Sequence, residues 1–556
     1  MHRGLGRAIT TLALQALLAS GGQTLIGPTE GLVQPAVLLD HGTFIGARDL
    51  NTSTNKFLGI PFAKPPVGDL RFRLTVANDP YTGTHNATEF GFVCSQQSFS
   101  SPFPPNMPNE TVDFFETALS PVIGTESEDC LTMNVWRPEN ITRGAKLPVV
   151  AYIYGGAFEV GATTEFDGGV IVQQSVKLGL PVIYVSMNYR VNAFGFLAGE
   201  EVKKAGVGNL GLQDQRLSLR WIQKYISAFG GDPDRVTIWG ESAGSVSIGL
   251  HLVANGGNTE GLFRGAIMES GFPSHHSDIT AGQADYDALV EQAGCQGSAD
   301  TLECLRQAPL DKLQAAINNS PSFFGSQSLN LVWAPRVDGN FVVDDPQELI
   351  LKGKVANVPF IAGDCDDEGT LFTVALSNIT TEQEVRDYLV SNYMPNISSS
   401  DLDRLLEFYP QDPSLGSPYD TGDENVFTPQ FKRLASIQGD YFFQEGRRFI
   451  LQERSGKQDA WSFVSKRVKT LPVLGAYHST DLISAYGQTD LTDYIINFVN
   501  NLDPNGPSVP QWPQYSTSSP QLMTLLDGPN TTITLDDFRA EPLAFIHEVA
   551  LHNPQW

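Results

Sequence analysis

Gly240, Ser242 and Gly244 form a Gly-x-Ser-x-Gly pentapeptide near the middle of the chain. The β-branched residues 236–238 precede it, and apolar residues at helical spacing follow it. A strand, a sharp turn and a helix in this order are typical of a nucleophile elbow, which holds a serine hydroxyl at the tip of the turn. Both glycines are expected because the strand and the helix approach too closely there for side chains. Ser242 is therefore the predicted nucleophile, and an ester carbonyl is a group that it could attack.

A serine nucleophile needs a general base, and the base needs an acid that orients it. In elbow enzymes the acid and then the histidine follow the serine along the chain. Three of the nine histidines follow a suitable acid, and His478 lies in a loop after the apolar residues 471–474, whereas His547 and His552 lie in the tail segment. His478 is the predicted base. Four carboxylates crowd the end of an expected strand at residues 358–363: Asp364, Asp366, Asp367 and Glu368. Position alone does not show which of them is the acid that orients the histidine.

A glycine-rich loop, residues 155–158, follows the apolar run at 149–154. Acyl transfer develops negative charge on the former carbonyl oxygen, and each preorganised N–H group aimed at that oxygen contributes roughly 10² to 10³-fold in rate. A loop of this kind at the carboxyl end of a strand can aim such groups. It is the candidate oxyanion loop.

Strand and helix signals alternate along the chain. Apolar, β-rich runs occur at 149–154, 182–187, 265–268, 358–362 and 461–464, and residues 217–229 repeat apolar side chains at helical spacing. This alternation predicts an α/β fold with a mostly parallel, twisted sheet and right-handed crossovers. Residues 375–455 are richer in helical pattern and are expected to form an insertion. No linker divides the chain, so residues 23–556 are predicted to be a single domain.

The composition favours a globular, exported protein that acts on neutral molecules. Of the 556 residues, 62 are Asp or Glu and 36 are Lys or Arg, and the net charge of −26 argues against binding nucleic acid or anionic membranes. Arg3 and Arg7, the apolar residues 8–19 and the small residues 20–22 have the pattern of a secretory signal, which we assign to residues 1–22. No later run is long and apolar enough for a membrane span.

Eight Asn-x-Ser/Thr sequons agree with a secretory route. They lie at Asn51, Asn86, Asn109, Asn140, Asn318, Asn378, Asn396 and Asn530. The histidines and cysteines have no metal-ligand spacing and there is no phosphate-binding loop, so no metal and no cofactor are expected.

Residues 229–244 resemble the serine signature of the type B carboxylesterase/lipase family, and residues 128–138 resemble its second signature. Residues 57–66 resemble a further stretch of the same family. The resemblance runs from about residue 30 to the end of the sequence and is closest to the secreted fungal branch of carboxylesterases, lipases and sterol esterases. It implies an α/β-hydrolase fold with helical insertions. It also implies a secreted serine carboxylic-ester hydrolase with a covalent acyl-enzyme.

The resemblance assigns roles to particular residues. The family's acid is usually a glutamate followed by Gly and Thr, as in Glu368, and its histidine segment is similar to that around His478. The N–H groups of Gly156, Ala157 and Ala243 would form the oxyanion hole. Many relatives have glycine where this chain has Ala157, and the added methyl group could narrow the pocket. Further candidates line the substrate pocket: Phe158 and Phe372.

Five cysteines occur in this oxidising context: Cys94, Cys130, Cys295, Cys304 and Cys365. Four cysteines can pair in three ways, and their order along the chain favours two local loops, Cys94 with Cys130 and Cys295 with Cys304. The family resemblance supports this pairing. Cys365 is then left as a buried free thiol.

Residues 95–129 are predicted to form a flap over Ser242. Within them Val112, Phe115 and Leu119 fall on one face of a possible helix, and Asn109 is placed to cap its start. Such a helix could cover an apolar cleft in water and turn outward in transient contact with a lipid surface. The same segment contains no Trp, so a cholinesterase-type site for a quaternary ammonium there is not expected.

The predicted function is a carboxylesterase with lipase-like character that takes small-molecule or lipid esters, preferring medium or long acyl chains. The alternative for the flap is that it packs permanently on the surface. The alternative functions are a short-chain carboxylesterase or sterol esterase without interfacial activation, and a cholinesterase-like adhesion protein without activity. The last of these typically loses triad residues and carries a membrane span, and neither is seen in this sequence.

Overall fold

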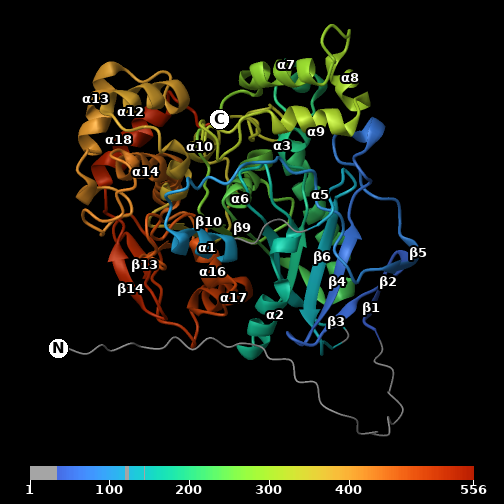
Figure 1. The fold of residues 1–556 in the computed structure, drawn as a ribbon. Helices are drawn as coiled ribbons and strands as arrows, with labels where there is room; N and C mark the ends of the chain where they lie inside the picture. The colour runs from blue at the N-terminus through green and yellow to red at the C-terminus, as the bar shows by residue number, and fades with distance from the viewer. Residues whose placement is uncertain (1–33, 119–123, 143) are drawn as a thin grey trace, which may run out of the picture. The chain divides into compact units, whose positions relative to one another are not determined.

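The computed structural model describes residues 34–118, 124–142 and 144–556. Residues 35–556 form one compact unit built around a large β-sheet (Figure 1). The expected secretory signal at residues 1–22 lies outside the described residues and stays a prediction.

Eleven of the described strands form one sheet, and three more form a small separate sheet of order β1, β2, β5. The large sheet has, in spatial order, β14 (Thr531–Leu535), β13 (Gln521–Leu525), β12 (Ala460–Ser465), β11 (Phe360–Cys365), β10 (Gly265–Glu269), β9 (Gly231–Glu241), β7 (Leu147–Ile153), β8 (Ile183–Met187), β6 (Thr132–Pro138), β4 (Thr54–Pro61) and β3 (Ala47–Asp49). The small sheet has β1 (Ala36–Leu39), β2 (His41–Ile45) and β5 (Thr82–Asn86).

The central strands are parallel. Every neighbouring pair from β8 to β13 is parallel, whereas the pairs at both edges of the sheet are antiparallel. All residues of β8, β10, β11 and β12 are buried, as expected for strands that are covered on both faces. Because parallel strands end at one edge, β9, β10 and β11 deliver the residues that follow them to the same place.

The helices cover the sheet and extend beyond it. They are α1 (Asn109–Ala118), α2 (Gly168–Lys177), α3 (Asn192–Phe196), α4 (Glu200–Ala205), α5 (Leu210–Tyr225), α6 (Ala243–Val253), α7 (Gln283–Gln292), α8 (Thr301–Gln307), α9 (Leu310–Asn318), α10 (Pro346–Leu351), α11 (Thr370–Thr373), α12 (Glu382–Tyr388), α13 (Ser399–Phe408), α14 (Phe431–Gly439), α15 (Glu445–Arg454), α16 (Thr480–Ala485), α17 (Asp490–Asn501) and α18 (Ala540–Ala550). Helices α5 and α6 contact each other and β9, whereas α2 and α17 contact each other and flank the sheet as a second group. In Figure 1, α12, α13, α14 and α18 gather together at the upper left.

The expected α/β fold is confirmed, and each expected strand overlaps an observed one within a few residues. The region 375–455 contains α12 to α15 and a π-helix, Asp440–Gln444, that continues α14 into α15. Among the described residues no helix is both long enough and apolar enough to cross a membrane.

Two disulfides occur in the pairing that chain order favours: Cys94–Cys130, here called the flap disulfide, and Cys295–Cys304. Cys365 is buried and forms no disulfide, and all five cysteines lie within the described residues. The flap disulfide joins the two ends of the segment that contains α1. This segment is thereby tied at its base to the strand β6, which begins at Thr132.

The flap segment contains the expected helix, but its start differs from the expectation. Asn109 is the first residue of α1 and does not cap it, because the carbonyl of Pro108 accepts the N–H groups of Thr111 and Val112. Val112 and Phe115 are half-buried, as expected for the inward face. Leu119, the third residue of that face, lies outside the described residues.

Candidate active site

The turn from β9 into α6 holds Ser242 in a strained backbone conformation with φ 55° and ψ −126°. A Cβ atom on Gly244 would lie 2.0 Å from the carbonyl oxygen of Ile153, and one on Gly240 would lie 2.6 Å from the backbone of Gly244. Side chains are therefore excluded at both positions, as the sequence predicted. The serine projects from the carboxyl edge of the sheet, between the strand that ends at Glu241 and a fully buried helix.

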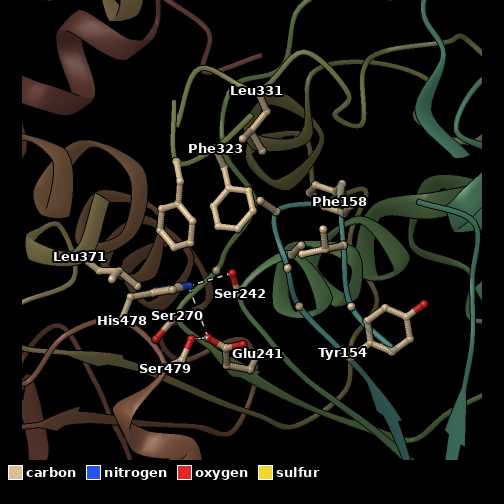
Figure 2. A pocket seen from close by; sticks show the side chains of 18 of the residues that line it. Tyr154, Phe158, Glu241, Ser242, Ser270, Phe323, Leu331, Leu371, His478 and Ser479 are labelled. Atoms are coloured by element: carbon tan, nitrogen blue, oxygen red, sulfur yellow. Dashed lines mark hydrogen bonds and ion pairs between the residues drawn. The ribbon is translucent and has the colours of Figure 1, made fainter. Parts of the chain in front are cut away.

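Three residues from distant parts of the chain meet at this edge, and Figure 2 shows two of them, Ser242 and His478. The Oγ atom of Ser242 lies 2.8 Å from Nε2 of His478, and Nδ1 of His478 lies 2.6 Å from Oε2 of Glu368. The histidine is in the loop between β12 and α16, and the glutamate follows β11. Both contacts have the distances of short hydrogen bonds, so a proton can pass from the serine to the imidazole.

The structure shows which of the four carboxylates contacts the histidine, a choice that sequence position alone could not make. Asp364 binds Arg447, and both Asp366 and Asp367 bind Lys469. Of the four, only Glu368 binds the histidine. Its second oxygen, Oε1, accepts the hydroxyl of Ser270 at 2.7 Å and the N–H group of Cys365 at 2.7 Å. Three donors thus fix this carboxylate.

Burial shapes the proton affinities of the site. It lowers the pKa of His478, which favours the neutral imidazole that a general base requires. It raises the pKa of Glu368, against which the hydrogen bonds from Ser270 and Cys365 act. It also raises the pKa of Glu241 to about 8, although that carboxyl lies 3.4 Å from Nε2 of His478.

Three residues of the site were not expected from the sequence: Glu241, Ser270 and Ser479. Ser479 donates a hydrogen bond to Glu241, which holds this carboxyl beside the imidazole (Figure 2). Glu241 directly precedes the nucleophile and Ser270 directly follows β10, so both lie at strand ends that share the edge of the sheet with Ser242. Their position at the ends of these strands was the feature of the sequence that could have identified them.

The glycine-rich loop after β7 packs directly on the elbow. A Cβ atom on Gly155 would lie 2.8 Å from the Cβ of Ser242. Gly156, Ala157 and Phe158 all have positive φ, and this turns the loop back over the serine. In the described part of the chain, the N–H groups of Gly156, Ala157 and Ala243 donate to no acceptor within the protein. They are free to bind an oxyanion.

A cavity of about 490 Å³ opens above Ser242. Apolar side chains dominate its lining, and both Phe158 and Phe372 are among them. Phe115 of α1 also reaches the cavity, so the flap segment forms part of the wall. None of the described residues that line it is Lys or Arg. Such a space fits uncharged, apolar groups.

Within the described residues there is no group of His, Cys, Asp and Glu that could hold a metal ion. His547 binds Glu445 and His275 binds Asp345, so these histidines have structural partners elsewhere.

The parallel sheet, with a strained serine at the carboxyl edge of its central strand, defines an α/β-hydrolase. The model of the carboxylesterase family matches residues 33–545, and the chain belongs to this family of carboxylic ester hydrolases. The chain is similar to Lipase 2 of Diutina rugosa, with 42% identity over 90% of this chain and 92% of that protein. It is 39% identical to Secreted lipase 1 of Botryotinia fuckeliana over 93% and 92% of the two chains. The solved structure of Aspergillus niger EstA superposes with a TM-score of 0.80 at 29% identity, covering 94% of this chain and 99% of that one.

Proposed function

We propose that this chain is a serine ester hydrolase that works through a covalent acyl-enzyme, with Ser242 as nucleophile, His478 as general base and Glu368 as the acid that orients it. The observation that carries the proposal is the continuous hydrogen-bonded chain from Oγ of Ser242 through His478 to Glu368 at the floor of an apolar cavity. The fungal lipases among its relatives support the same reaction class.

In the first half of the reaction Oγ of Ser242 forms a bond to the ester carbonyl carbon while His478 takes its proton. The carbonyl oxygen becomes an oxyanion, which the N–H groups of Gly156, Ala157 and Ala243 stabilise. The tetrahedral intermediate breaks its bond to the alkoxy oxygen, and the imidazolium returns the proton to the leaving alcohol. Glu368 stabilises the imidazolium throughout. Water then attacks the acyl-enzyme in the same way, releasing the carboxylic acid and Ser242.

The decisive experiment is Ser242→Ala. The elbow tolerates a missing hydroxyl, so the variant is expected to fold with an unchanged thermal unfolding profile and to lose hydrolysis of p-nitrophenyl esters by roughly 10⁶-fold. An organophosphate should modify the native chain at Ser242 and leave the variant unmodified. Wild-type turnover in the variant, or a label on another residue, would show that the nucleophile is misassigned.

We further propose that the flap segment, residues 95–129, is a lid and that the enzyme acts on medium- or long-chain esters at a lipid surface. Phe115 lines the cavity, and its ring lies 6.2 Å from that of Tyr477, the neighbour of His478. Thr111 donates a hydrogen bond to the carbonyl of Pro472 in the same loop. The apolar face of α1 therefore rests on the loop that carries the base, and turning α1 outward would expose both this face and the cavity.

Tributyrin hydrolysis measured across its solubility limit tests the lid. The rate should rise sharply once droplets form, and soluble esters should show a preference for medium or long acyl chains. Phe115→Ser should reduce the rise at the interface while leaving hydrolysis of dissolved ethyl acetate within a few-fold of the native rate. A hyperbolic curve without such a rise, together with a preference for acetyl esters, would favour a plain short-chain carboxylesterase.

Secretion is part of the proposal. All eight sequon asparagines are exposed, so each is accessible to glycosylation. The two disulfides require an oxidising compartment, and a relative is named a secreted lipase. Expression with the native leader should yield active glycoprotein in the medium, and its mass should fall on treatment with an endoglycosidase. Retention of unglycosylated enzyme in the cytosol would contradict this.

A further inference from the structure

One wall of the cavity above Ser242 comes from a residue far along the chain. Trp556 lines the same cavity as the serine, although it follows α18 and belongs to no strand or helix of the sheet. Its side chain is almost fully buried, with 8% exposed. Because the indole borders the cavity, its position fixes part of the space that a substrate can use.

The indole is held in place by several hydrogen bonds. Its Nε1–H group donates to the carbonyl of Leu329 at 3.0 Å. The carbonyl of Trp556 accepts the N–H group of Ser277, and the N–H group of Gln555 donates to the carbonyl of His275 at 2.9 Å. The backbone on both sides of the indole is therefore anchored to the segment after β10. The one polar atom of the ring is used, so the surface that it offers to the cavity is hydrocarbon.

The neighbours of Trp556 belong to the oxyanion side of the site. Its ring meets the edge of Phe158 at a centroid distance of 6.2 Å and an angle of 82°, and Phe158 in turn packs on Phe196. Leu329, whose carbonyl accepts the indole N–H group, and Leu331 also line the cavity. Aromatic and branched side chains packed in this way leave little freedom to move aside.

The two ends of an ester separate on opposite sides of the serine. The imidazolium must hand its proton to the leaving alcohol, so the alcohol end lies beside His478. Figure 2 shows Phe158 on the other side of Ser242 from His478. The wall that contains Phe158 and Trp556 therefore lies away from the leaving alcohol, on the side of Ser242 that is left for the carbonyl oxygen and the acyl chain.

We propose that Trp556 is a specificity-determining residue that limits the length of the acyl chain accepted at Ser242. This inference rests on the proposed esterase function. A rigid apolar wall rejects each additional methylene group that would overlap it, and one methylene group in such a pocket changes kcat/KM by about 10-fold or more. Replacing the indole by a small side chain opens space at the acyl end alone.

The test uses two series of esters below their solubility limits. In the first the alcohol is p-nitrophenol and the acyl chain runs from two to sixteen carbons, and in the second the acyl group is butyryl and the alcohol varies. Trp556→Ala should move the optimum of the first series to longer chains and raise kcat/KM for the chain just beyond the native optimum by about 10-fold relative to the native optimum substrate. The second series should keep its native order.

Trp556→Phe removes the hydrogen bond to Leu329 but keeps an aromatic wall, so its shift should have the same direction and a smaller size. If the alanine variant does not fold, the acyl profile of the phenylalanine variant alone tests the inference. The matched control is Trp512→Phe, because Trp512 is also buried and donates its Nε1–H group to the carbonyl of Ser462, but it does not line the cavity. Its acyl profile should be native.

Acyl profiles of folded Trp556 variants that coincide with the native profile would overturn the inference, as would a change confined to the alcohol series. A shift of equal size in Trp512→Phe would also overturn it, because the effect would then follow from general loosening of the core. These outcomes differ from failure of the proposed function, in which the native enzyme would hydrolyse no ester or Ser242→Ala would remain active.

Discussion

Replacing Glu368 by glutamine should disable the enzyme while preserving its shape. In the native site one oxygen of Glu368 accepts the N–H group of Cys365 and the other faces Nδ1 of His478. A backbone N–H group can only donate, so the amide oxygen of the introduced glutamine must occupy the first position. The NH₂ group of this amide then points at Nδ1, which must become an acceptor. The ring proton moves to Nε2, and the nitrogen that should receive the proton of Ser242 is already protonated.

The magnitude follows from this change of tautomer. Such a substitution in a serine–histidine–acid triad lowers kcat by about 10⁴-fold, which corresponds to about 5 kcal/mol of transition-state stabilisation. The amide oxygen takes the place of Oε1 and can still accept the hydroxyl of Ser270, so the fold should keep its stability within about 1 kcal/mol. KM should change little, because the cavity wall is intact.

Steady-state kinetics with p-nitrophenyl butyrate and thermal unfolding of the same preparation measure the two effects. Glu407→Gln, at an exposed position of α13, is the control and should retain native kinetics. A Glu368→Gln enzyme with kcat within about 10-fold of the native value would refute the reasoning about the tautomer. A large loss of thermal stability would instead mean that Glu368 is chiefly a structural residue.

Four other substitutions test the framework around the site. Cys94→Ser should lower the free energy of unfolding by about 4 kcal/mol and Cys295→Ser by about 2.5 kcal/mol in the chain-entropy model, because the two disulfides span 36 and 9 residues, and denaturant titration measures both. Arg447→Met should cost about 3 to 5 kcal/mol at pH 7, because it leaves buried Asp364 without its ion-pair partner and leaves Arg448 as the one arginine bound to Asp536. Since Arg447 holds the pKa of Asp536 below its ordinary value, the stabilisation is present above about pH 4 and is lost as the pH falls further, so the difference from the native protein should shrink in acid. Asp367→Asn should lower kcat by about 10²-fold with KM unchanged, because this carboxylate accepts an N–H group from the loop that carries the base.

The sequence predicted the parts of the fold that local patterns encode. The elbow glycines could be read in advance because a strand that turns at once into a helix leaves no room for a Cβ atom, and the distance of 2.0 Å at Gly244 bears this out. The buried central strands could be read from continuous apolar runs. The choice of Glu368 among four carboxylates depended on the family resemblance, because a cluster of acids at a strand end has no local feature that says which side chain faces the histidine.

Other features depend on contacts that no local pattern records. Trp556 lines the cavity only because the chain after α18 returns to the segment that follows β10. Glu241 is held near the imidazole by Ser479, which lies 238 residues away in sequence. Helix α1 begins one residue earlier than the sequence predicts, since it uses the carbonyl of Pro108 where the pattern favours the side chain of Asn109.

The long separations within the site also bear on when the enzyme becomes active during synthesis. His478 contacts Ser242 and Glu368 across 236 and 110 residues of sequence, respectively. A chain growing from its amino end therefore carries the proposed nucleophile and the proposed acid before the proposed base has been made. Under the proposed mechanism, ester cleavage cannot begin until the chain has been translated past His478 and β12 has joined the sheet. Activity would thus report that the segments around Ser242, Glu368 and His478 have all been made and have folded together, and a shorter nascent chain would stay inert.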